Sequence, residues 1–310
     1  MRVRASLAVG ALIVAALALR AAVGHRDTGT RAASFRFDGR HRSYLFHLPA
    51  GKPRGGLPLV IVLHGAGGQG RGMERLSGLS PVADREGFAV AYPDGIWRQW
   101  NDGRGKIAFP RTDDVGFLLA MVDHLTSDGT VDPHRVYVAG ISNGGMMAQR
   151  LACEASDRIA AVTSVAATLP EKIEHECQPQ RPVSMLFMHG TKDPLVPYRG
   201  GMITSPHGMP TGSRVLSLDA TARFWAERNG CAASPESSAL PDRAEDNLTV
   251  RVSRYGSCRD HVSVEAYTIN GGGHTWPGGL QYLPAFVIGR TSRNLDADET
   301  IWQFFKRASR

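Results

Sequence analysis

A serine placed between a strand and a helix constrains this chain more than any other feature. The serine is the centre of Gly140-Ile141-Ser142-Asn143-Gly144; a β-branched segment at residues 135–139 leads into it, and a helix-compatible segment at 146–152 follows. A strand that turns this sharply into a helix needs flanking glycines, because side chains there would block the close backbone approach. The pattern therefore predicts a strained turn that exposes the Ser142 hydroxyl at a sheet edge, as in a nucleophile elbow.

Strand and helix patterns alternate along most of the chain. Residues 34–49 alternate polar with aromatic or β-branched types, which predicts two antiparallel edge strands. A helix is expected at 114–125, and a last helix is expected to begin at Asp296 with Glu299 as its capping partner. Apolar segments typical of strands buried on both faces lie at 58–63, 88–92, 135–139, 183–188 and 262–269. Such repeated units predict an α/β fold, with helices on both faces of a mostly parallel central sheet.

Length and composition fit one large α/β domain, which we expect to span residues 34–310. No low-complexity linker divides this range. Charged residues make up 21% of the chain and apolar residues 42%, a balance that argues against a disordered chain and against a multi-span membrane protein. Two stretches rich in glycine, proline and polar residues, 95–111 and 200–213, are expected to be excursions over the sheet edge.

The first 24 residues predict export. Arg2 and Arg4 precede an apolar stretch at 5–19 and small residues suited to cleavage near Gly24, as in a secretion signal; an uncleaved anchor is the alternative. We therefore expect an extracellular or periplasmic protein. Cleavage would remove Arg20 as well and lower the formal net charge from +7 to +4. Since the basic residues are spread along the chain, we expect no nucleic-acid partner, and no membrane partner beyond the possible anchor.

The four cysteines suit disulfide bonds in an exported chain. Three pairings are possible. We favour Cys153 with Cys177 and Cys231 with Cys258, because each closes a short local loop that would stabilise the fold by roughly 3 kcal/mol in the chain-entropy model. A zinc site is the rival interpretation, but only His175 and Cys177 stand at ligand spacing, so no metal is expected.

Three side chains in the order Ser, Asp, His carry the chemistry. A serine hydroxyl needs an adjacent imidazole to take its proton, and the imidazole needs a carboxylate to hold its tautomer. Asp193 follows the predicted strand at 183–188, and His274 follows the strand at 262–269 within a glycine-rich loop. Both therefore belong at the same carboxyl edge as Ser142. For each residue the alternative is structural: a tight turn for the serine, a turn carboxylate for Asp193 and a hydrogen-bonded loop histidine for His274.

The loop after the strand at 58–63 has a different task. Its sequence is His64-Gly65-Ala66-Gly67-Gly68, and we assign the backbone N–H of Ala66, with that of Asn143, to an oxyanion hole. The alternative is a glycine turn that only relieves crowding. Neither glycine-rich phosphate-binding pattern is met there, so no nucleotide cofactor is expected.

Other residues near this edge have two interpretations each. Asp113 and Asp114 open a helix, and we expect end caps rather than catalytic acids. Four aromatic residues on neighbouring loops are candidates to line a substrate pocket, although loop aromatics often only anchor a loop to the core: Trp97, Trp100, Tyr198 and Trp276.

The motifs LHGAGG, WNDGR, DDVGFLLAMVDHL, GISNGGMMAQRLAC, HGTKDPLVPYRGG, GGGHTWPGG and the closing LPAFVIGRTSRNLDADETIWQFF together resemble the polyhydroxybutyrate depolymerase-like esterase family. That family also includes enzymes similar to feruloyl and acetylxylan esterases. The resemblance covers nearly everything from about Ser34 onward. It implies an α/β-hydrolase fold and a secreted serine esterase without a cofactor, and it carries Ser142, Asp193 and His274 over as the triad.

Substrate is the point on which the chain departs from part of that family. Members that attack solid polyester typically carry a linker and a separate substrate-binding domain, whereas this sequence stops at Arg310, directly after the last predicted helix. We therefore expect small or oligomeric esters as substrates: hydroxyalkanoate oligomers, or phenolic and acetyl esters of plant polysaccharide. Two rivals remain open, a serine peptidase on the same fold and a non-catalytic binding protein that keeps the scaffold.

Overall fold

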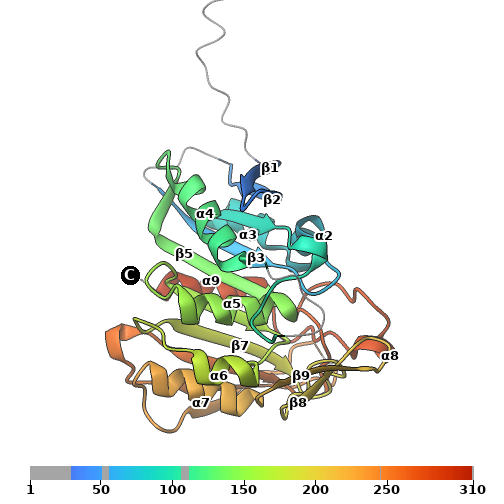
Figure 1. The fold of residues 1–310 in the computed structure, drawn as a ribbon. Helices are drawn as coiled ribbons and strands as arrows, with labels where there is room; N and C mark the ends of the chain where they lie inside the picture. Colours follow the sequence, from blue (N-terminus) through green and yellow to red (C-terminus); the bar gives the residue numbers. More distant parts are fainter. Residues whose placement is uncertain (1–28, 51–55, 106–111, 245, 309–310) are drawn as a thin grey trace, which may run out of the picture.

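The computed structural model describes residues 29–50, 56–105, 112–244 and 246–308; the predicted leader at 1–24 lies outside them. In the described part, ten strands form one sheet in the order β1-β2-β4-β3-β5-β6-β7-β12-β11-β10 (Figure 1). Their bounds are β1 Gly29–Phe37, β2 Arg40–Leu48, β3 Leu57–Leu63, β4 Ala89–Pro93, β5 Val131–Ile141, β6 Ala161–Val165, β7 Ser184–Gly190, β10 Glu236–Ala239, β11 Val250–Tyr255 and β12 Val264–Ile269.

The middle of the sheet is parallel and its two edges are antiparallel. The strands from β4 to β12 in the sheet order pair in parallel. Antiparallel pairs close one edge through β1 and β2 and the other through β11 and β10. The mostly parallel sheet predicted from the alternating pattern is confirmed. The short strand β6 and the edge strands β10 and β11 were not anticipated, although Val250-Arg251-Val252-Ser253 alternates apolar with polar residues as an edge strand does.

Helices cover both faces of the sheet, as predicted. They are α2 Gly70–Ser77, α3 Leu79–Glu86, α4 Asp114–Thr126, α5 Asn143–Glu154, α6 Glu171–Glu176, α7 Leu218–Arg228, α8 Ala285–Ile288 and α9 Ala297–Arg307. Strand β3 shows why two layers are needed: Leu59 and Ile61 pack in the core on the side of α4, α5 and α7, whereas Val60 and Val62 pack on the side of α3 and α9. Alternate residues of β3 are thus buried on opposite faces of the sheet. The predicted cap of α9 is present, with Asp296 accepting from the Glu299 N–H.

One segment expected to be a loop is a hairpin. Strands β8 (Gly201–Thr204) and β9 (Pro210–Val215) pair with each other outside the main sheet. Glycines that allow positive φ, at positions 200, 201, 208 and 212, gave this stretch the composition of a loop. Figure 1 places the hairpin near α8, beyond the ends of the central strands.

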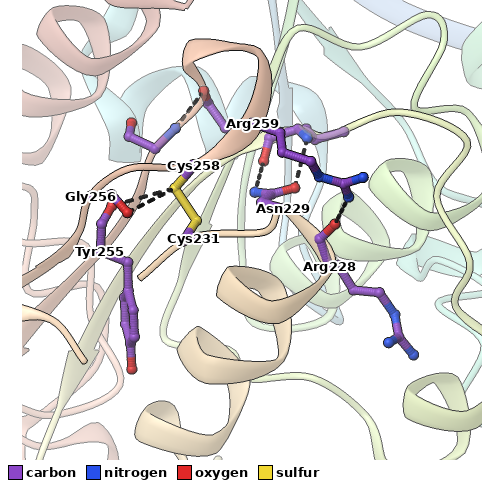
Figure 2. Close-up of a disulfide and its surroundings, with 10 residues drawn as sticks. Arg228, Asn229, Cys231, Tyr255, Gly256, Cys258 and Arg259 are labelled. Carbon is purple, nitrogen blue, oxygen red and sulfur yellow. Dashed lines mark hydrogen bonds between the residues drawn. A yellow bond between two sulfur atoms is a disulfide. The ribbon is translucent and has the colours of Figure 1, made fainter. Parts of the chain in front are cut away.

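The cysteines form the pairing favoured from the sequence, Cys153 with Cys177 and Cys231 with Cys258. Figure 2 shows the second bond, which joins Cys231, three residues beyond the end of α7, to Cys258 in the turn after β11. Beside it, the Asn229 side chain holds the backbone of Val183 on both sides, donating to its oxygen and accepting from its N–H. The carboxyl end of α7 is thus tied both to β11 and to the start of β7. No helix in the described ranges is long and apolar enough to cross a membrane.

Candidate active site

Ser142 stands at the sharp junction between β5 and α5. Its backbone has φ 57° and ψ −124°, a conformation that costs a non-glycine residue free energy and marks functional sites. The turn is tight on both sides: a Cβ on Gly140 would lie 2.4 Å from the Gly144 oxygen, and a Cβ on Gly144 would lie 2.4 Å from the Leu63 oxygen. Only glycine fits either position, so the predicted turn geometry is confirmed.

Asp193 and His274 meet at the carboxyl ends of β7 and β12. His274 Nδ1 donates to Asp193 Oδ2 over 2.8 Å, and the backbone N–H groups of Leu195 and Val196 donate to Oδ1 over 2.8 and 2.9 Å. The Asp193 side chain has no exposed surface. Its burial raises the pKa of the carboxyl, but His274 and His189 beside it lower the pKa more, so the pKa lies well below its ordinary value. Asp193 is therefore a buried carboxylate that fixes the His274 tautomer.

Ser142 and His274 line the same cavity, which has a volume of about 580 Å³. The Ser142 hydroxyl and the His274 ring make no direct hydrogen bond within the described part of the chain. Such bonds are often long in unliganded enzymes and shorten when substrate binds. The structure thus brings Ser142, Asp193 and His274 to one edge of the sheet, where the sequence placed them.

The glycine-rich loop after β3 lies against the serine. A Cβ on Gly65 would be 3.3 Å from Ser142 Cβ, and Ala66 and Asn143 both line the cavity. The Gly65 carbonyl accepts from the Gly68 N–H, while the Ala66 N–H donates to no atom of the described chain. Asn143 is the first residue of α5, where a backbone N–H has no partner within the helix. Two backbone donors are thus available beside Ser142.

His64 is a structural histidine. Its Nδ1 donates to the Gly65 carbonyl over 2.8 Å, and its Nε2 accepts from the Gly95 N–H over 3.0 Å, so the ring is neutral. Burial lowers its pKa, which favours the same state. Both ring nitrogens are engaged, which agrees with assigning the base to His274.

Comparisons with known proteins give the family. A family model described as "Esterase PHB depolymerase" matches residues 42–172. The protein named "Putative esterase NocK" of Nocardia uniformis subsp. tsuyamanensis is 37% identical over 288 residues, which are 90% of this chain and 83% of that protein. The chain belongs to the esterase PHB depolymerase family. It is an esterase with an α/β-hydrolase fold.

Two further known proteins are similar to this chain, one in sequence and one in fold. Feruloyl esterase B of Piromyces equi is 33% identical over 70% of this chain but only 39% of its own length. The solved structure of an acetyl xylan esterase from Aspergillus awamori superposes with a TM-score of 0.60 at 15% identity, over 90% of this chain and all of that one. At this identity the second likeness shows the fold alone.

The Asn143 side chain organises this esterase's WNDGR segment, a role that the sequence did not reveal. Its Nδ2 donates to the Trp100 carbonyl over 3.0 Å and to Asp102 Oδ2 over 2.5 Å, and its Oδ1 accepts from the Trp100 N–H over 2.8 Å. Trp100 Nε1 in turn donates to the His64 carbonyl over 2.9 Å. One buried amide therefore ties the elbow to the loop that carries Ala66.

The expected aromatic lining is wrong for the two buried tryptophans. Trp100 and Trp276 have no exposed surface, and each indole N–H is used inside the protein, by the His64 carbonyl and by Asp298. Trp97 is 75% exposed, and the Tyr198 hydroxyl shares a hydrogen bond with the Thr268 hydroxyl. Neither residue contributes to the cavity wall. These residues anchor loops or lie on the surface. The prediction failed because a sequence can place an aromatic residue near the sheet edge without showing which way its side chain points.

Tyr282 is the aromatic residue that does line the cavity of the esterase, and no motif in the sequence singled it out. Its hydroxyl donates to the backbone oxygen of His274 over 2.9 Å. The other cavity residues come mainly from the 65–76 segment, the β8–β9 hairpin and the segment around α8, and the apolar ones among them include Met73, Leu76, Leu195, Ile203, Leu283 and Ile288.

The two aspartates at the start of α4 have different roles. Asp113 is the expected cap and accepts from the Gly116 N–H. Asp114 is not a cap: it is fully buried, binds Arg42 over 2.7 Å and accepts from the Asn101 N–H, so it joins α4 to β2 and the WNDGR segment. Within the described residues, no group of three potential ligand side chains suited to a metal occurs.

Proposed function

We propose that this esterase hydrolyses carboxylic esters through an acyl-enzyme on Ser142. His274 takes the proton of the Ser142 hydroxyl as it attacks the ester carbonyl, and Asp193 stabilises the resulting imidazolium. The observation that carries the proposal is the buried Asp193–His274 hydrogen bond at the wall of the cavity that Ser142 lines.

The remaining steps use groups already in place. The backbone N–H groups of Asn143 and Ala66 stabilise the oxyanion of the tetrahedral intermediate. His274 then gives its proton to the leaving alcohol, and a water molecule activated by the same ring releases the acyl group. None of these steps needs a bound cofactor.

Small or oligomeric esters are the proposed substrates, with hydroxyalkanoate oligomers as the first candidate because of the family. Esters of plant polysaccharide are the second candidate. The cavity volume of about 580 Å³ and the Tyr282 ring on its wall favour a bulky acyl group such as feruloyl over acetyl, and the feruloyl esterase relative points the same way.

Export completes the proposal. Two disulfide bonds form in oxidising compartments, and the sequence of the first 24 residues has the charge and apolar pattern of a secretion signal. We propose an extracellular or periplasmic enzyme.

The test compares wild type with Ser142→Ala on p-nitrophenyl esters, hydroxybutyrate oligomers, feruloyl esters and acetylated xylan. Wild type should turn over at least one class, and the variant should lose at least 10³-fold in kcat, in line with loss of a nucleophile. A fluorophosphonate probe should label wild type but not Ser142→Ala. It should still label the control Ser237→Ala, which removes an exposed serine outside the cavity. Equal labelling of all three would contradict the assignment; faster cleavage of aminoacyl anilides than of esters would favour the peptidase rival.

A further inference from the structure

A second histidine lies against the acid of the predicted triad. His189 is the penultimate residue of β7, and its side chain has no exposed surface. Its Nε2 lies 2.9 Å from the Val196 carbonyl oxygen and 3.3 Å from Asp193 Oδ2. Since a carbonyl oxygen only accepts, the hydrogen must be on Nε2.

The other ring nitrogen supports this tautomer. Nδ1 of His189 is buried and has no hydrogen-bond partner within the described chain. A protonated Nδ1 there would leave a buried donor unsatisfied, whereas a bare nitrogen costs less. His189 is therefore a one-sided donor that presents its single N–H to the acid loop.

Asp193 Oδ2 consequently faces two histidines. It accepts from His274 Nδ1 at 2.8 Å and lies 3.3 Å from His189 Nε2, while Oδ1 is held by the N–H groups of Leu195 and Val196. The His189 N–H donates to the Val196 carbonyl, and the same nitrogen lies 3.3 Å from Oδ2, so the oxygen that orients the predicted base also has a second imidazole N–H beside it. A donor near a carboxylate oxygen stabilises its charge and reduces the negative potential that a neighbouring imidazole feels.

We propose that His189 is a positioning residue that holds the Asp193 carboxylate in place and limits the proton affinity of His274 by sharing Oδ2. The inference rests on the proposed function, in which His274 is the base. Limited affinity keeps the His274 ring free to accept the serine proton nearer neutral pH, where a general base is most effective. The titratable groups facing this pair are Tyr198, whose ring meets that of His189 at its edge, and Tyr282, which donates to the His274 backbone.

Two substitutions separate the donor from the bulk of the ring. His189→Gln places an amide N–H close to the position of Nε2, whereas His189→Met fills similar space without a donor. We would measure kcat/KM for p-nitrophenyl butyrate between pH 5 and pH 9, at the isosbestic wavelength of the product, for wild type and both variants. The acid-side pKa of this profile reports the essential base of the free enzyme.

The expected result is an upward shift of the acid-side pKa by about 0.5 unit in His189→Met and a shift below about 0.2 unit in His189→Gln. The plateau should fall several-fold in His189→Met, because the carboxylate is less well fixed. A merely structural role would lower the plateau or the melting temperature and leave the kinetic pKa unchanged. An unshifted profile in folded His189→Met, or equal shifts in both variants, would overturn the proposal.

A second measurement does not depend on activity or on the folding of His189→Met. Long-range ¹H–¹⁵N spectra of uniformly labelled wild type, with His189 assigned by comparison with His189→Gln, should show Nε2 protonated and Nδ1 bare at neutral pH. A protonated Nδ1 would overturn the proposal by itself. If wild type hydrolyses no ester while these spectra show the expected tautomer, the proposed function fails and the placement of His189 stands.

Discussion

The Tyr282 hydroxyl donates to the backbone carbonyl of His274 over 2.9 Å, so a residue of the cavity wall holds the loop that carries the predicted base. The bond joins two segments that follow β12 and would otherwise be held mainly by glycine-rich backbone contacts. Position and orientation of a general base are worth orders of magnitude in rate. The cavity wall and the position of His274 are therefore coupled through one side chain.

Removing this hydroxyl should reduce turnover more than stability. We expect Tyr282→Phe to lower kcat about 3- to 10-fold on small p-nitrophenyl esters, since a hydrogen bond of about 1 kcal/mol that orients His274 is lost. The control is Tyr137→Phe, which removes a 3.0 Å bond from a tyrosine hydroxyl to the Ala308 carbonyl outside the cavity. That variant should keep wild-type kcat. Equal kcat in both variants would mean that Tyr282 does not position His274.

Asn143 should matter through its side chain as well as its backbone. In Asn143→Ala the backbone N–H remains, but the buried Trp100 N–H loses its acceptor, and the Trp100 carbonyl and Asp102 Oδ2 each lose one of their donors. We expect a loss of about 2–4 kcal/mol in the free energy of unfolding and a fall of 10- to 100-fold in kcat. The reason is that Trp100, which binds the His64 carbonyl in the loop that carries Ala66, is no longer fixed by the Asn143 side chain.

Asn229 provides the matched control for this prediction. It is equally buried and holds a backbone N–H and carbonyl in the same two-sided way, at Val183 beside the second disulfide (Figure 2). Asn229→Ala should cost similar stability by urea unfolding yet keep kcat in the folded fraction. A comparable loss of kcat in both variants would show that the effect of Asn143→Ala is only on folding.

The elbow glycines give a steric prediction. A methyl group in Gly144→Ala would lie 2.4 Å from the Leu63 oxygen and 2.5 Å from the His64 oxygen, so α5 or the end of β3 must move. We expect loss of at least 2 kcal/mol of stability and of nearly all esterase activity, because the shift displaces both proposed oxyanion donors. Gly256→Ala, where an added Cβ meets nothing within 4 Å, should remain within about 0.5 kcal/mol of wild type by thermal unfolding.

The elements that could be predicted from the sequence are those with an unambiguous local pattern. The central strands carry continuous apolar runs, and the elbow, Asp193 and His274 follow strand ends, so their common edge follows from topology alone. The hairpin β8–β9 escaped prediction because its glycines give it the composition of a loop. Side-chain direction also escaped: nothing in the order of residues shows that Trp276 points into the core while Tyr282 faces the cavity.

The hydrogen bonds of Asn143 and His189 show a second limit of sequence reasoning. Asn143 was chosen for its backbone N–H, and His189, the first residue after the predicted strand at 183–188, was assigned no role. Their side-chain roles depend on where residues 100–102 and the Asp193–Val196 loop lie after folding. Long-range side-chain contacts of this kind leave no periodic pattern.

Asp298 should make stability fall as pH rises. Burial raises the pKa of this carboxyl to about 8, although the Trp276 indole N–H that it accepts lowers it in part. The folded protein therefore binds this proton more tightly than the unfolded chain, in which an aspartate titrates near pH 4. The stabilising contribution is complete below pH 4 and is lost progressively up to about pH 8, where the buried carboxylate is charged.

Asp298→Asn keeps an oxygen to accept from Trp276 and cannot ionise. The free energy of unfolding of the variant minus that of wild type should rise by about 1–2 kcal/mol between pH 5 and pH 9. This is less than the whole rise in the Asp298 pKa would give, because solvent reaches part of the side chain. Urea unfolding of both proteins at unit pH steps measures it, and the pH dependence common to all other groups cancels. Because Trp276 lies two residues after His274, wild-type activity at pH 9 should also decline faster with temperature than that of the variant. A pH-independent stability difference would assign Asp298 an ordinary pKa.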